Sequence, residues 1–392
     1  MKNVLLVFGG KSYEHDISVV TAMQVFNKVK TDKFKLHLLY VSRENKLFLY
    51  ESKVFKQNDF SVHNFSAKNK NFRQVEFVFG EKKKLFLRSV FGLKEYLVAD
   101  VAIFACHGGD GENGQLSSLF KQMGIAVSAG AVDGLGVCMN KFLFKQVMKG
   151  VKVPVVNGFK ISKYEFDNVE SKNKIQLKLR LLKFPVVIKA NSGGSSIGVF
   201  VANSIHEFDK LINQAFEFDD VVLVERFVKN AREFNVAVLG DGEFCEVSEI
   251  DEPLKTEEVL TFADKYLGAE KFKGQKLKMG SMEGLKKKFP ADISYELAEK
   301  IKNCAFRIFR NLNLFGVVRI DFLYSEETNK FYVCEVNSIP GSLAYYFFAQ
   351  GQVLINEFVL RLIELAERNY EKEQRFNSEF VTDILNWTVD SL

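Results

Sequence analysis

The fold is decided by two short segments near the carboxyl end, Val317-Val318-Arg319-Ile320-Asp321-Phe322-Leu323-Tyr324 and Phe331-Tyr332-Val333-Cys334-Glu335-Val336-Asn337. Both segments alternate polar and apolar residues, which is the period of a strand with one buried face. A short turn of Glu, Thr and Asn separates them. The pattern therefore predicts two paired antiparallel strands.

This hairpin would bring two carboxylates together. If it is symmetric about Thr328, Asp321 lies opposite Glu335 and Arg319 lies opposite Asn337, all four on one face. Directly opposed side chains lie about 4.5 to 5.5 Å apart at Cβ, and two carboxylates at that distance repel each other unless a positive charge separates them. Carboxylate and amide oxygens are ligands that Mg²⁺ prefers when it carries a nucleotide. The alternative is a solvated hairpin face with an incidental acid pair.

A glycine- and serine-rich loop follows an apolar strand that ends in a lysine. Lys189 closes the strand, and the loop runs from Asn191 to Gly198. Its backbone N–H groups can turn toward phosphate oxygens. It is not a Walker A loop, because Val199-Phe200 stand where that motif requires Lys-Ser/Thr. The loop alone is equally compatible with a plain hairpin turn.

Two further segments are candidates for ligand contacts. The apolar strand that ends at 223–228 joins the middle and last parts of the chain and could offer backbone hydrogen bonds to an adenine edge, although alone it would be only a buried strand end. The run His107-Gly108-Gly109-Asp110-Gly111-Glu112-Asn113-Gly114 follows a strand and opens a helix, where free N–H groups favour an anionic group. A lone histidine such as His107 is more often structural.

Composition excludes several classes of protein. The 392 residues, 47% of them hydrophobic, are enough for two or three domains. A net charge of +5 from 54 basic and 49 acidic residues, without a long basic stretch, argues against nucleic acid as a partner. Five cysteines without a Cys-x-x-Cys pair, and histidines without zinc spacing, fit a reduced cytosol. No stretch is long and apolar enough to span a membrane, and the run Val4 to Phe8 is too short for a signal peptide.

The order of strands and helices predicts an α/β protein with three domains. Residues 1–138 alternate strands and helices and predict a parallel α/β domain, with an inserted elaboration at about 43–98 whose pairing the pattern does not reveal. Residues 139–228 predict a small central α/β domain. Residues 229–392 predict an antiparallel sheet with a helical tail. Within them the charged stretch 251–290 is either a lid or a disordered segment, and we favour a lid.

Taken together, these features resemble the ATP-grasp enzymes, and among them the D-alanine-D-alanine ligases, over almost the whole chain. Because eight motifs occur in the same order, chance agreement is a poor explanation. The motifs are Phe8-Gly9-Gly10-Lys11-Ser12-Tyr13-Glu14, the 107–114 loop, Met139-Asn140-Lys141, Lys189 with Gly194-Ser195-Ser196-Ile197-Gly198, Glu233-Phe234-Asn235-Val236, Lys265-Tyr266-Leu267, Arg319-Ile320-Asp321 and Glu335-Val336-Asn337-Ser338-Ile339-Pro340-Gly341.

The resemblance implies that ATP binds between the central and C-terminal domains and phosphorylates the carboxylate of one D-alanine, which a second D-alanine then attacks. The implied ATP-binding residues are Lys141, Lys189, Ser196 and Lys265 at the phosphates, Glu225, Arg226, Phe227 and Val228 at adenine, and Glu233 at the ribose. The implied ligands of two Mg²⁺ ions, with Mn²⁺ as an alternative metal, are Asp321, Glu335 and Asn337.

For the amino acids, the resemblance implies that Glu14 faces the ammonium of the first D-alanine and is linked to Ser195 and Tyr266. Arg319 and the N–H of Gly341 would stabilise the oxyanion. The other residues implied around the substrates are His107, Ser342, Tyr346 and Phe347. A homodimer formed through the first domain, a cytoplasmic location and a role in making peptidoglycan precursors are further implications.

The chain departs from the family pattern at two places. Ala190 and Gly193 stand where many relatives have proline and an acidic residue. The contacts between this loop and the phosphates can therefore differ from those in relatives. Tyr346-Phe347 stand where a small hydroxyl residue and a leucine are usual, which leaves the size of the acceptor site open. A ligase with another acceptor, such as D-lactate or a different amino acid, and a non-catalytic nucleotide-binding relative therefore remain alternatives.

Overall fold

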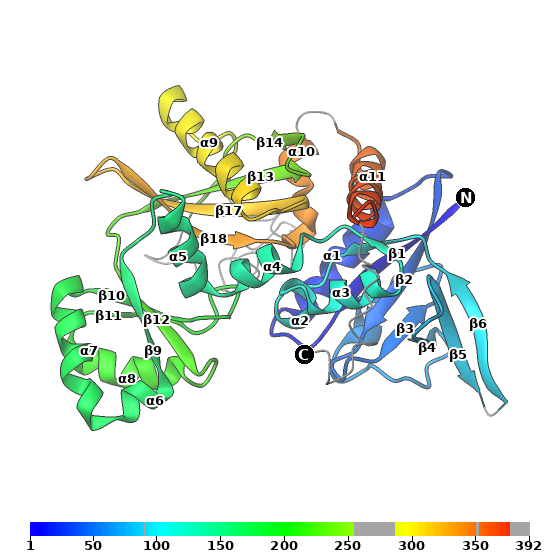
Figure 1. The fold of residues 1–392 in the computed structure, drawn as a ribbon, viewed down its shortest axis with the longest axis horizontal. Helices are drawn as coiled ribbons and strands as arrows, with labels where there is room; N and C mark the ends of the chain where they lie inside the picture. The colour runs from blue at the N-terminus through cyan, green and yellow to red at the C-terminus, as the bar shows by residue number, and fades with distance from the viewer. Residues whose placement is uncertain (90, 255–286, 350–352, 377–392) are drawn as a thin grey trace, which may run out of the picture.

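The computed structural model describes residues 1–89, 91–254, 287–349 and 353–376, which form three α/β units (Figure 1). An N-terminal unit is built on a mixed sheet, a small unit lies in the middle of the chain, and a C-terminal unit is built on an antiparallel sheet. The predicted three-part α/β architecture is confirmed.

The N-terminal sheet contains eight strands in the order β6-β5-β4-β3-β2-β1-β7-β8. Its parallel half consists of β1 (Lys2–Gly9), β2 (Phe34–Val41), β7 (Val101–Phe104) and β8 (Ala126–Val127). The middle of β1 is apolar and fully buried, as expected for a parallel strand covered on both faces. The loops that position ligands in such sheets follow the carboxyl ends of the strands. The helices of this unit are α1 (His15–Lys28), α2 (Gly109–Glu112) and α3 (Gln115–Gln122).

The inserted segment, whose pairing the sequence left open, continues this sheet as antiparallel strands. They are β3 (Leu47–Tyr50), β4 (Phe72–Phe77), β5 (Lys84–Ser89) and β6 (Gly92–Val98), with the short 3₁₀ helix η1 (Gln57–Phe60) between β3 and β4. Aromatic side chains of the insertion pack against the parallel half. The ring centroid of Tyr40 in β2 lies 5.0 Å from that of Phe60 and 5.1 Å from that of Phe65. These contacts have edge-to-face geometry, which aromatic pairs prefer.

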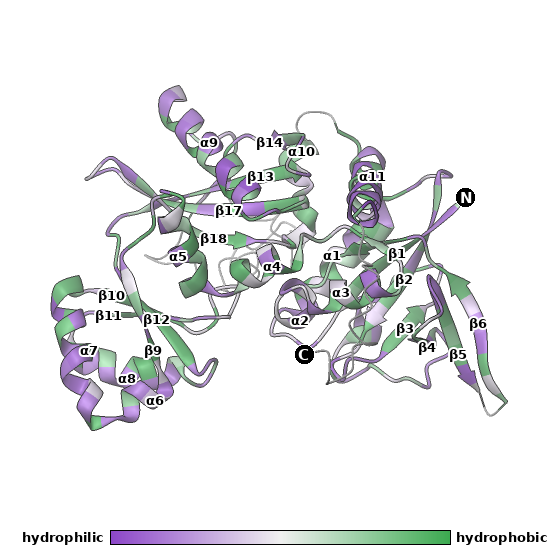
Figure 2. Ribbon diagram, viewed as in Figure 1, coloured by the Kyte–Doolittle hydropathy of each residue, from purple (hydrophilic) through white to green (hydrophobic). Residues whose placement is uncertain are grey.

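The central unit is a four-stranded antiparallel sheet in the order β11-β10-β12-β9. Its strands are β9 (Gly158–Ser162), β10 (Val186–Ala190), β11 (Val199–Ala202) and β12 (Val221–Arg226). Three helices pack on it: α6 (Lys163–Asp167), α7 (Val169–Leu182) and α8 (Ile205–Ala215). Hydrophilic and hydrophobic residues are interspersed along these helices (Figure 2). The sequence pattern missed β9, the edge strand, because Gly158-Phe159-Lys160-Ile161-Ser162 is short and only half-buried.

The C-terminal sheet has the order β14-β13-β17-β18. Its strands are β13 (Arg232–Gly240), β14 (Cys245–Val247), β17 (Gly316–Ser325) and β18 (Lys330–Asn337). Helix α9 (Tyr295–Asn311) packs on this sheet. The α4 (Val132–Met139) and α5 (Lys141–Gly150) helices lead into the central unit, but Phe144 and Met148 of α5 belong to the same core as β13 and β17. The domain boundaries proposed from the sequence remain a prediction.

The last segments return to the N-terminal unit. After β18 come the 3₁₀ helix η4 (Gly341–Ala344), α10 (Tyr346–Ala349) and α11 (Ile355–Gln374). Phe358 and Leu362 of α11 share a core with β1 and β7, so the helical tail lies beside the first strands of the chain (Figure 1). Two short strands, β15 (Glu252–Pro253) and β16 (Lys287–Lys288), pair at the ends of the proposed lid, whose residues 255–286 lie outside the described part.

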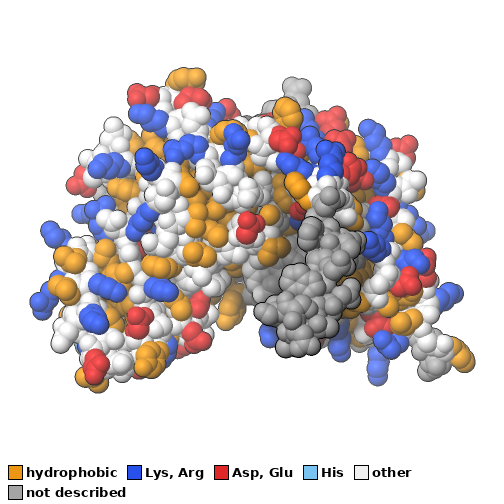
Figure 3. Space-filling view, viewed as in Figure 1, with side chains coloured by type: hydrophobic (Ala, Val, Ile, Leu, Met, Phe, Trp, Pro, Cys, Tyr) orange, Lys and Arg blue, Asp and Glu red, His pale blue; other side chains and the backbone are white. Residues whose placement is uncertain are grey.

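The distribution of surface charge and the state of the cysteines are those expected from the composition. Basic and acidic side chains are interspersed on the face shown in Figure 3, without a continuous basic area. All five cysteines are free thiols. Within the residues that the structure describes, none of the helices has the length and hydrophobicity that crossing a membrane requires.

Candidate active site

The predicted hairpin forms, and its site half has the predicted register. Arg319 pairs with Asn337 and Asp321 pairs with Glu335 across β17 and β18. The expected symmetry about Thr328 fails nearer the turn, because Phe322 pairs with Val333 and leaves Cys334 as an extra residue in β18. This β-bulge bends the strand next to the two carboxylates.

Asp321 is held by its own strand and by the strand opposite. Its two carboxylate oxygens accept hydrogen bonds from Nε and Nη2 of Arg319 at 2.7 and 2.8 Å, and Oδ2 also accepts one from Asn337 Nδ2 at 3.0 Å. Arg319 therefore supplies positive charge that the sequence argument assigned to a metal alone. Two carboxylates and an amide oxygen on one face still form a donor set suited to Mg²⁺, which would share Asp321 with the guanidinium.

A pocket lies between the central sheet and the C-terminal hairpin, and it brings together ten of the residues predicted to bind ATP or metal. They are Lys141, Lys189, Ser196, Glu225, Arg226, Phe227, Val228, Glu233, Asp321 and Glu335. The pocket is therefore lined by Lys141, Lys189 and Arg226 as well as by the two hairpin carboxylates. This arrangement suits an anionic ligand that carries a divalent cation.

The sequence analysis missed the apolar walls of this pocket. They include Val156, Val187, Ile197, Val199 and Leu323. A signal was available: Val187 and Lys189 are two residues apart on β10 and so share a face, and Lys189 pairs with Val199 of β11. Apolar side chains on the pocket side of the sheet are the surfaces on which a flat ring could pack.

Hydrogen bonds hold the glycine loop, residues 191–198, against the start of α5. Lys141 N donates to the Asn191 carbonyl at 3.0 Å, and Phe142 N donates to Asn191 Oδ1 at 2.9 Å. The Lys141 ammonium donates to the Gly193 carbonyl. Burial lowers the pKa of Lys141, while the carboxylate of Glu335 opposes that effect. Lys141 and the loop are thus positioned together.

Three charged side chains form a buried ionic cluster beside the pocket: Lys145 of α5, Lys189 of β10 and Glu225 of β12. Glu225 contacts Lys145, and its Oε2 lies 2.7 Å from Lys189 Nζ. Burial would raise the pKa of Glu225, but the two lysines outweigh it and hold the pKa at about 2. Burial would likewise lower the pKa of Lys189, yet anionic neighbours, Glu225 among them, raise it. Glu225 and Lys189 therefore both stay charged.

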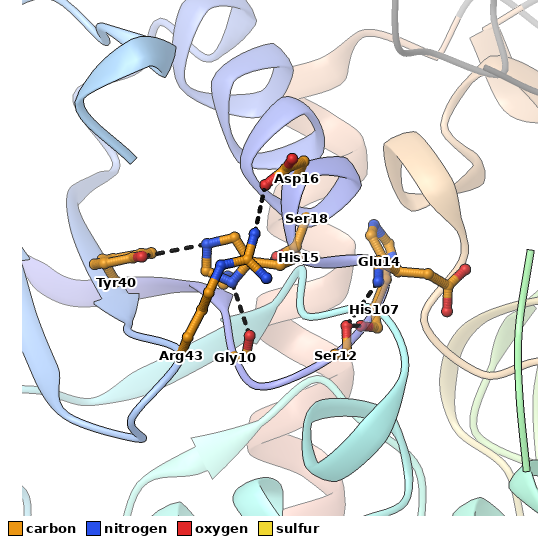
Figure 4. Close-up of polar contacts among 10 residues, drawn as sticks. Gly10, Ser12, Glu14, His15, Asp16, Ser18, Tyr40, Arg43 and His107 are labelled. Atoms are coloured by element: carbon orange, nitrogen blue, oxygen red, sulfur yellow. Dashed lines mark hydrogen bonds and ion pairs between the residues drawn. The ribbon is translucent and has the colours of Figure 1, made fainter. Parts of the chain in front are cut away.

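Glu14 lies where the N-terminal and central units meet. Its carboxylate accepts a hydrogen bond from Ser195 of the glycine loop, and it leaves no room for a Cβ at Gly108 or Gly194, where one would lie 2.7 and 2.4 Å from Glu14 Oε2. In Figure 4 its side chain points away from His15 and toward the central unit. The predicted link between Glu14 and Ser195 is present, whereas its third predicted member, Tyr266, and the predicted phosphate-binding residue Lys265 lie outside the described residues.

His107 is buried, with only 3% of its surface exposed, and both ring nitrogens lie near protein groups. Nδ1 is 2.7 Å from the Ile339 carbonyl and Nε2 is 2.8 Å from Thr21 Oγ1. Burial lowers the pKa of His107 to about 4, so the ring is neutral near pH 7. The carbonyl of His107 accepts from Ser12 Oγ at 2.5 Å (Figure 4), which joins the loops after β1 and β7.

Glu112 connects the same loop to the end of β18. Oε2 accepts from Gly108 N at 2.9 Å, and Oε1 accepts from Ile339 N and Ser338 Oγ, each at 3.2 Å. Burial, and then the nearby carboxylate of Glu14, raise the pKa of Glu112 to about 7. The sequence analysis did not single out Glu112 as a site residue.

The segment after β18 carries the remaining predicted residues. Gly341 and Ser342 begin η4, and Ser342 N donates to Thr21 Oγ1 at 3.1 Å. Tyr346 and Phe347 stack with ring centroids 4.5 Å apart, and Lys287 Nζ lies 3.5 Å from the centroid of the Tyr346 ring. The ring of Tyr346 therefore lies next to one end of the proposed lid.

Family models match two long segments of the chain. Residues 3–129 match the model described as the D-ala D-ala ligase N-terminus, and residues 147–353 match the D-ala D-ala ligase C-terminus. The chain is 31% identical over 390 residues, 100% of both proteins, to the D-alanine-D-alanine ligase of Thermosipho africanus.

Solved structures agree with this match. The D-alanine-D-alanine ligase of Coxiella burnetii superposes with a TM-score of 0.76 at 23% identity, covering 95% of this chain and 96% of that one. The VanG D-Ala:D-Ser ligase of Enterococcus faecalis gives a TM-score of 0.73 at 25% identity, covering 93% and 99%. On the family models and the full-length identity, this chain belongs to the D-alanine-D-alanine ligase family and is a ligase.

Proposed function

We propose that this chain uses ATP to join two molecules of D-alanine through a D-alanyl phosphate intermediate, which supplies the dipeptide for peptidoglycan precursors. The observation that carries the proposal is the pocket that gathers lysines from the central unit and the carboxylates of Asp321 and Glu335 from the hairpin. Binding alone does not require Arg319 to hold Asp321 with both carboxylate oxygens engaged.

ATP would occupy this pocket. The β- and γ-phosphates would contact Lys141, Lys189 and Ser196, with Lys265 added from the lid, while adenine would lie at 225–228 and the ribose at Glu233. A divalent cation bound by Asp321, Glu335 and Asn337 would neutralise phosphate charge, and we propose two Mg²⁺ ions there. Phosphoryl transfer depends on positioning and on stabilising spread negative charge, which is the role that we propose for these side chains.

The amino acids would bind on the N-terminal side of the same site. The Glu14 carboxylate suits the ammonium of the first D-alanine, and its hydrogen bond to Ser195 fixes its direction toward the glycine loop. Tyr266 would complete this group from the lid. The attack of the second amine creates an oxyanion, which Arg319 and the N–H of Gly341 would stabilise. The other residues that we place around the amino acids are His107, Ser342, Tyr346 and Phe347.

Three further expectations belong to this proposal. The three parts of the chain are read as a substrate domain at 1–138, a central domain at 139–228 and a C-terminal domain at 229–392 with a lid at about 251–290. The protein acts in the cytoplasm, where ATP and D-alanine are available. It assembles as a homodimer through its N-terminal unit.

The product analysis tests the proposal directly. Purified protein with ATP, Mg²⁺ and D-alanine is expected to form D-alanyl-D-alanine, ADP and phosphate in equal amounts, measured by mass spectrometry and phosphate release. Arg319→Met is expected to lower kcat by about 10² to 10³, because a charged group that stabilises the transition state is lost. Arg88→Met is the matched control, since Arg88 is an exposed side chain that pairs with Glu76 far from the pocket.

Mixed substrates decide between acceptors. D-alanine is offered with D-serine or with D-lactate, and the products are compared with those formed from D-alanine alone. A mixed product in place of D-alanyl-D-alanine would assign a different acceptor to the residues around Tyr346-Phe347. Absence of any ADP release with all three substrates would contradict the catalytic proposal and favour a nucleotide-binding role.

A further inference from the structure

The turn after β18 has an unusual backbone. Ser342, Leu343 and Ala344 have φ values of 54°, 51° and 50°, so three consecutive residues other than glycine lie in the left-handed region. L-amino acids visit this region at a conformational cost, and such residues persist only where their surroundings fix them. The turn begins at Gly341, whose N–H is proposed to face the reacting carbonyl.

A chain of hydrogen bonds from the N-terminal unit closes this turn on itself. Ser342 N lies 3.1 Å from Thr21 Oγ1, and Thr21 Oγ1 lies 2.8 Å from His107 Nε2. His107 Nδ1 in turn lies 2.7 Å from the Ile339 carbonyl. This series of hydrogen bonds therefore starts at Ser342 and ends at Ile339, at the other end of the same turn. Thr21 and His107 are both almost completely buried.

The chemistry of the groups fixes the direction of every proton in this chain. A carbonyl oxygen can only accept, so Nδ1 of His107 carries the proton that faces Ile339. Since burial keeps the ring neutral, Nε2 has no proton and must accept from the hydroxyl of Thr21. The oxygen of Thr21 is then free to accept the Ser342 N–H. Each donor has an acceptor, with the hydroxyl acting once in each role.

A second contact from the same helix reinforces the first. Gln24 is three residues after Thr21 on α1 and so lies on the same face. Its Oε1 accepts a hydrogen bond from Ser342 Oγ at 2.6 Å. Both the backbone and the side chain of Ser342 are therefore held by α1, which is the helix that Glu14 precedes.

We propose that Thr21 is a positioning residue for the second amino acid: through Ser342 and His107 it holds the left-handed turn that places the Gly341 N–H and the acceptor side of the site. This inference rests on the proposed ligase function. Thr21 itself lies beneath the turn and is not among the residues that line the ATP pocket. The hydroxyl should therefore affect the acceptor step and leave nucleotide binding alone.

The test compares Thr21→Val, which keeps the shape and removes the hydroxyl, with Thr21→Ser, which keeps the hydroxyl. D-Alanine dependence of the rate gives separate KM values for the donor and acceptor subsites. Thr21→Val is expected to raise the acceptor KM by about tenfold, the effect of losing one or two buried hydrogen bonds, with the KM for ATP changed less than about twofold. ADP release should also exceed dipeptide formation, because misplaced acceptor leaves D-alanyl phosphate to water. Thr21→Ser should restore the wild-type values.

Several outcomes would overturn the inference. Equal changes in all three KM values, or a lower melting temperature with unchanged kinetics, would make Thr21 merely structural. If Thr21→Val does not fold, Gln24→Met provides the same comparison from the side chain of Ser342, with a smaller rise in acceptor KM expected and an unchanged acceptor KM counting against the idea. If the wild-type protein forms no dipeptide, the proposed function fails and this inference fails with it, whereas normal dipeptide formation by Thr21→Val overturns the inference alone.

Discussion

Two buried polar clusters join the three units of this protein, and they use different chemistry. The ionic cluster, defined above as Lys145, Lys189 and Glu225, joins the central sheet to α5 through two ion pairs. The second, which we call the neutral cluster, consists of Thr21, His107 and Glu112 with the backbone of 338–342, and it joins the N-terminal unit to the end of β18. Burial moves the pKa of His107 down and that of Glu112 up, so both shift toward uncharged forms.

This difference follows from what each cluster lies beside. The ionic cluster borders the pocket proposed for a triphosphate, where the buried cation of Lys189 suits an anionic ligand, and Glu225 lies 2.7 Å from that cation. The neutral cluster lies beneath the proposed amino-acid site, where its task is geometric. An extra buried charge there would compete with the charges of the substrate. Buried charge is thus retained where the ligand is an anion and suppressed where only a backbone position is needed.

Removing the anion of the ionic cluster should have the largest effect on stability. Glu225→Leu leaves Lys145 and Lys189 buried side by side without their shared carboxylate. Breaking a buried ion pair from one side typically costs about 3 to 5 kcal/mol, and the free energy of unfolding is expected to fall by that amount. Urea denaturation followed by circular dichroism measures it.

A double variant tests whether charge is the cause. Lys145→Met combined with Glu225→Leu removes one cation as well, so it should be more stable than Glu225→Leu alone. Glu296→Leu is a surface control, since Glu296 is exposed and pairs with Lys300 one turn along the same helix, and it should change stability little. Equal stability of the double and single variants would mean that lost packing, rather than uncompensated charge, explains the result.

The neutral cluster should respond less to a comparable change. Glu112→Gln keeps one carbonyl oxygen, but Gly108 N and Ile339 N donate to different oxygens of Glu112, so one backbone N–H would face an amide NH₂. Leaving one buried donor unsatisfied costs about 1 to 3 kcal/mol, and unfolding free energies at pH 7 should show a loss of this size. Asp110→Asn, in the same loop but not in the cluster, serves as the control. A loss as large as that of Glu225→Leu would erase the distinction between the clusters.

The sequence predicted the parts of the site that depend on local pattern. Alternation along β17 and β18 was sufficient to place Asp321 opposite Glu335, because register follows from the period of two. The bulge at Cys334 was not predictable in the same way, since it changes the backbone without leaving a mark in the alternation of side chains. Motif order carried the family assignment, whereas the pairing of β3 to β6 needed the three-dimensional fold.

The clusters themselves depend on long-range contacts, which single-sequence patterns do not contain. Lys189 and Glu225 were each expected at the nucleotide, but the ion pairs of Glu225 with Lys189 and Lys145 were not. A partial signal existed, because Lys141 and Lys145 are four residues apart and lie on one face of α5. For Thr21 no signal existed: its partner Ser342 is 321 residues away along the chain.

The smallest effect expected in the wild-type protein concerns pH, because two opposing contributions cancel, and their separation distinguishes the neutral cluster most sharply from the ionic one. His107 has a folded pKa of about 4, below its ordinary 6.5, so its contribution makes the protein more stable as pH rises between these values. Glu112 has a folded pKa of about 7, above its ordinary 4.5, so its contribution is complete below pH 4.5 and is lost as pH rises toward 7.

The two contributions have opposite slopes of up to about 1.4 kcal/mol per pH unit, and they should cancel between roughly pH 4.5 and 6.5 in the wild-type protein. Glu112→Gln removes the contribution that falls with pH, so the free energy of unfolding of this variant relative to wild type should rise with pH in this window. His107→Asn removes the contribution that rises with pH, so its relative free energy of unfolding should fall. The neighbouring charges that act on the pair, Glu14 and Arg319, are unchanged in both variants. Because the comparison uses differences from wild type at each pH, titration elsewhere in the molecule drops out. Parallel curves for the three proteins would show that both groups keep their charge on folding, and the neutral cluster would then be ionic like the other.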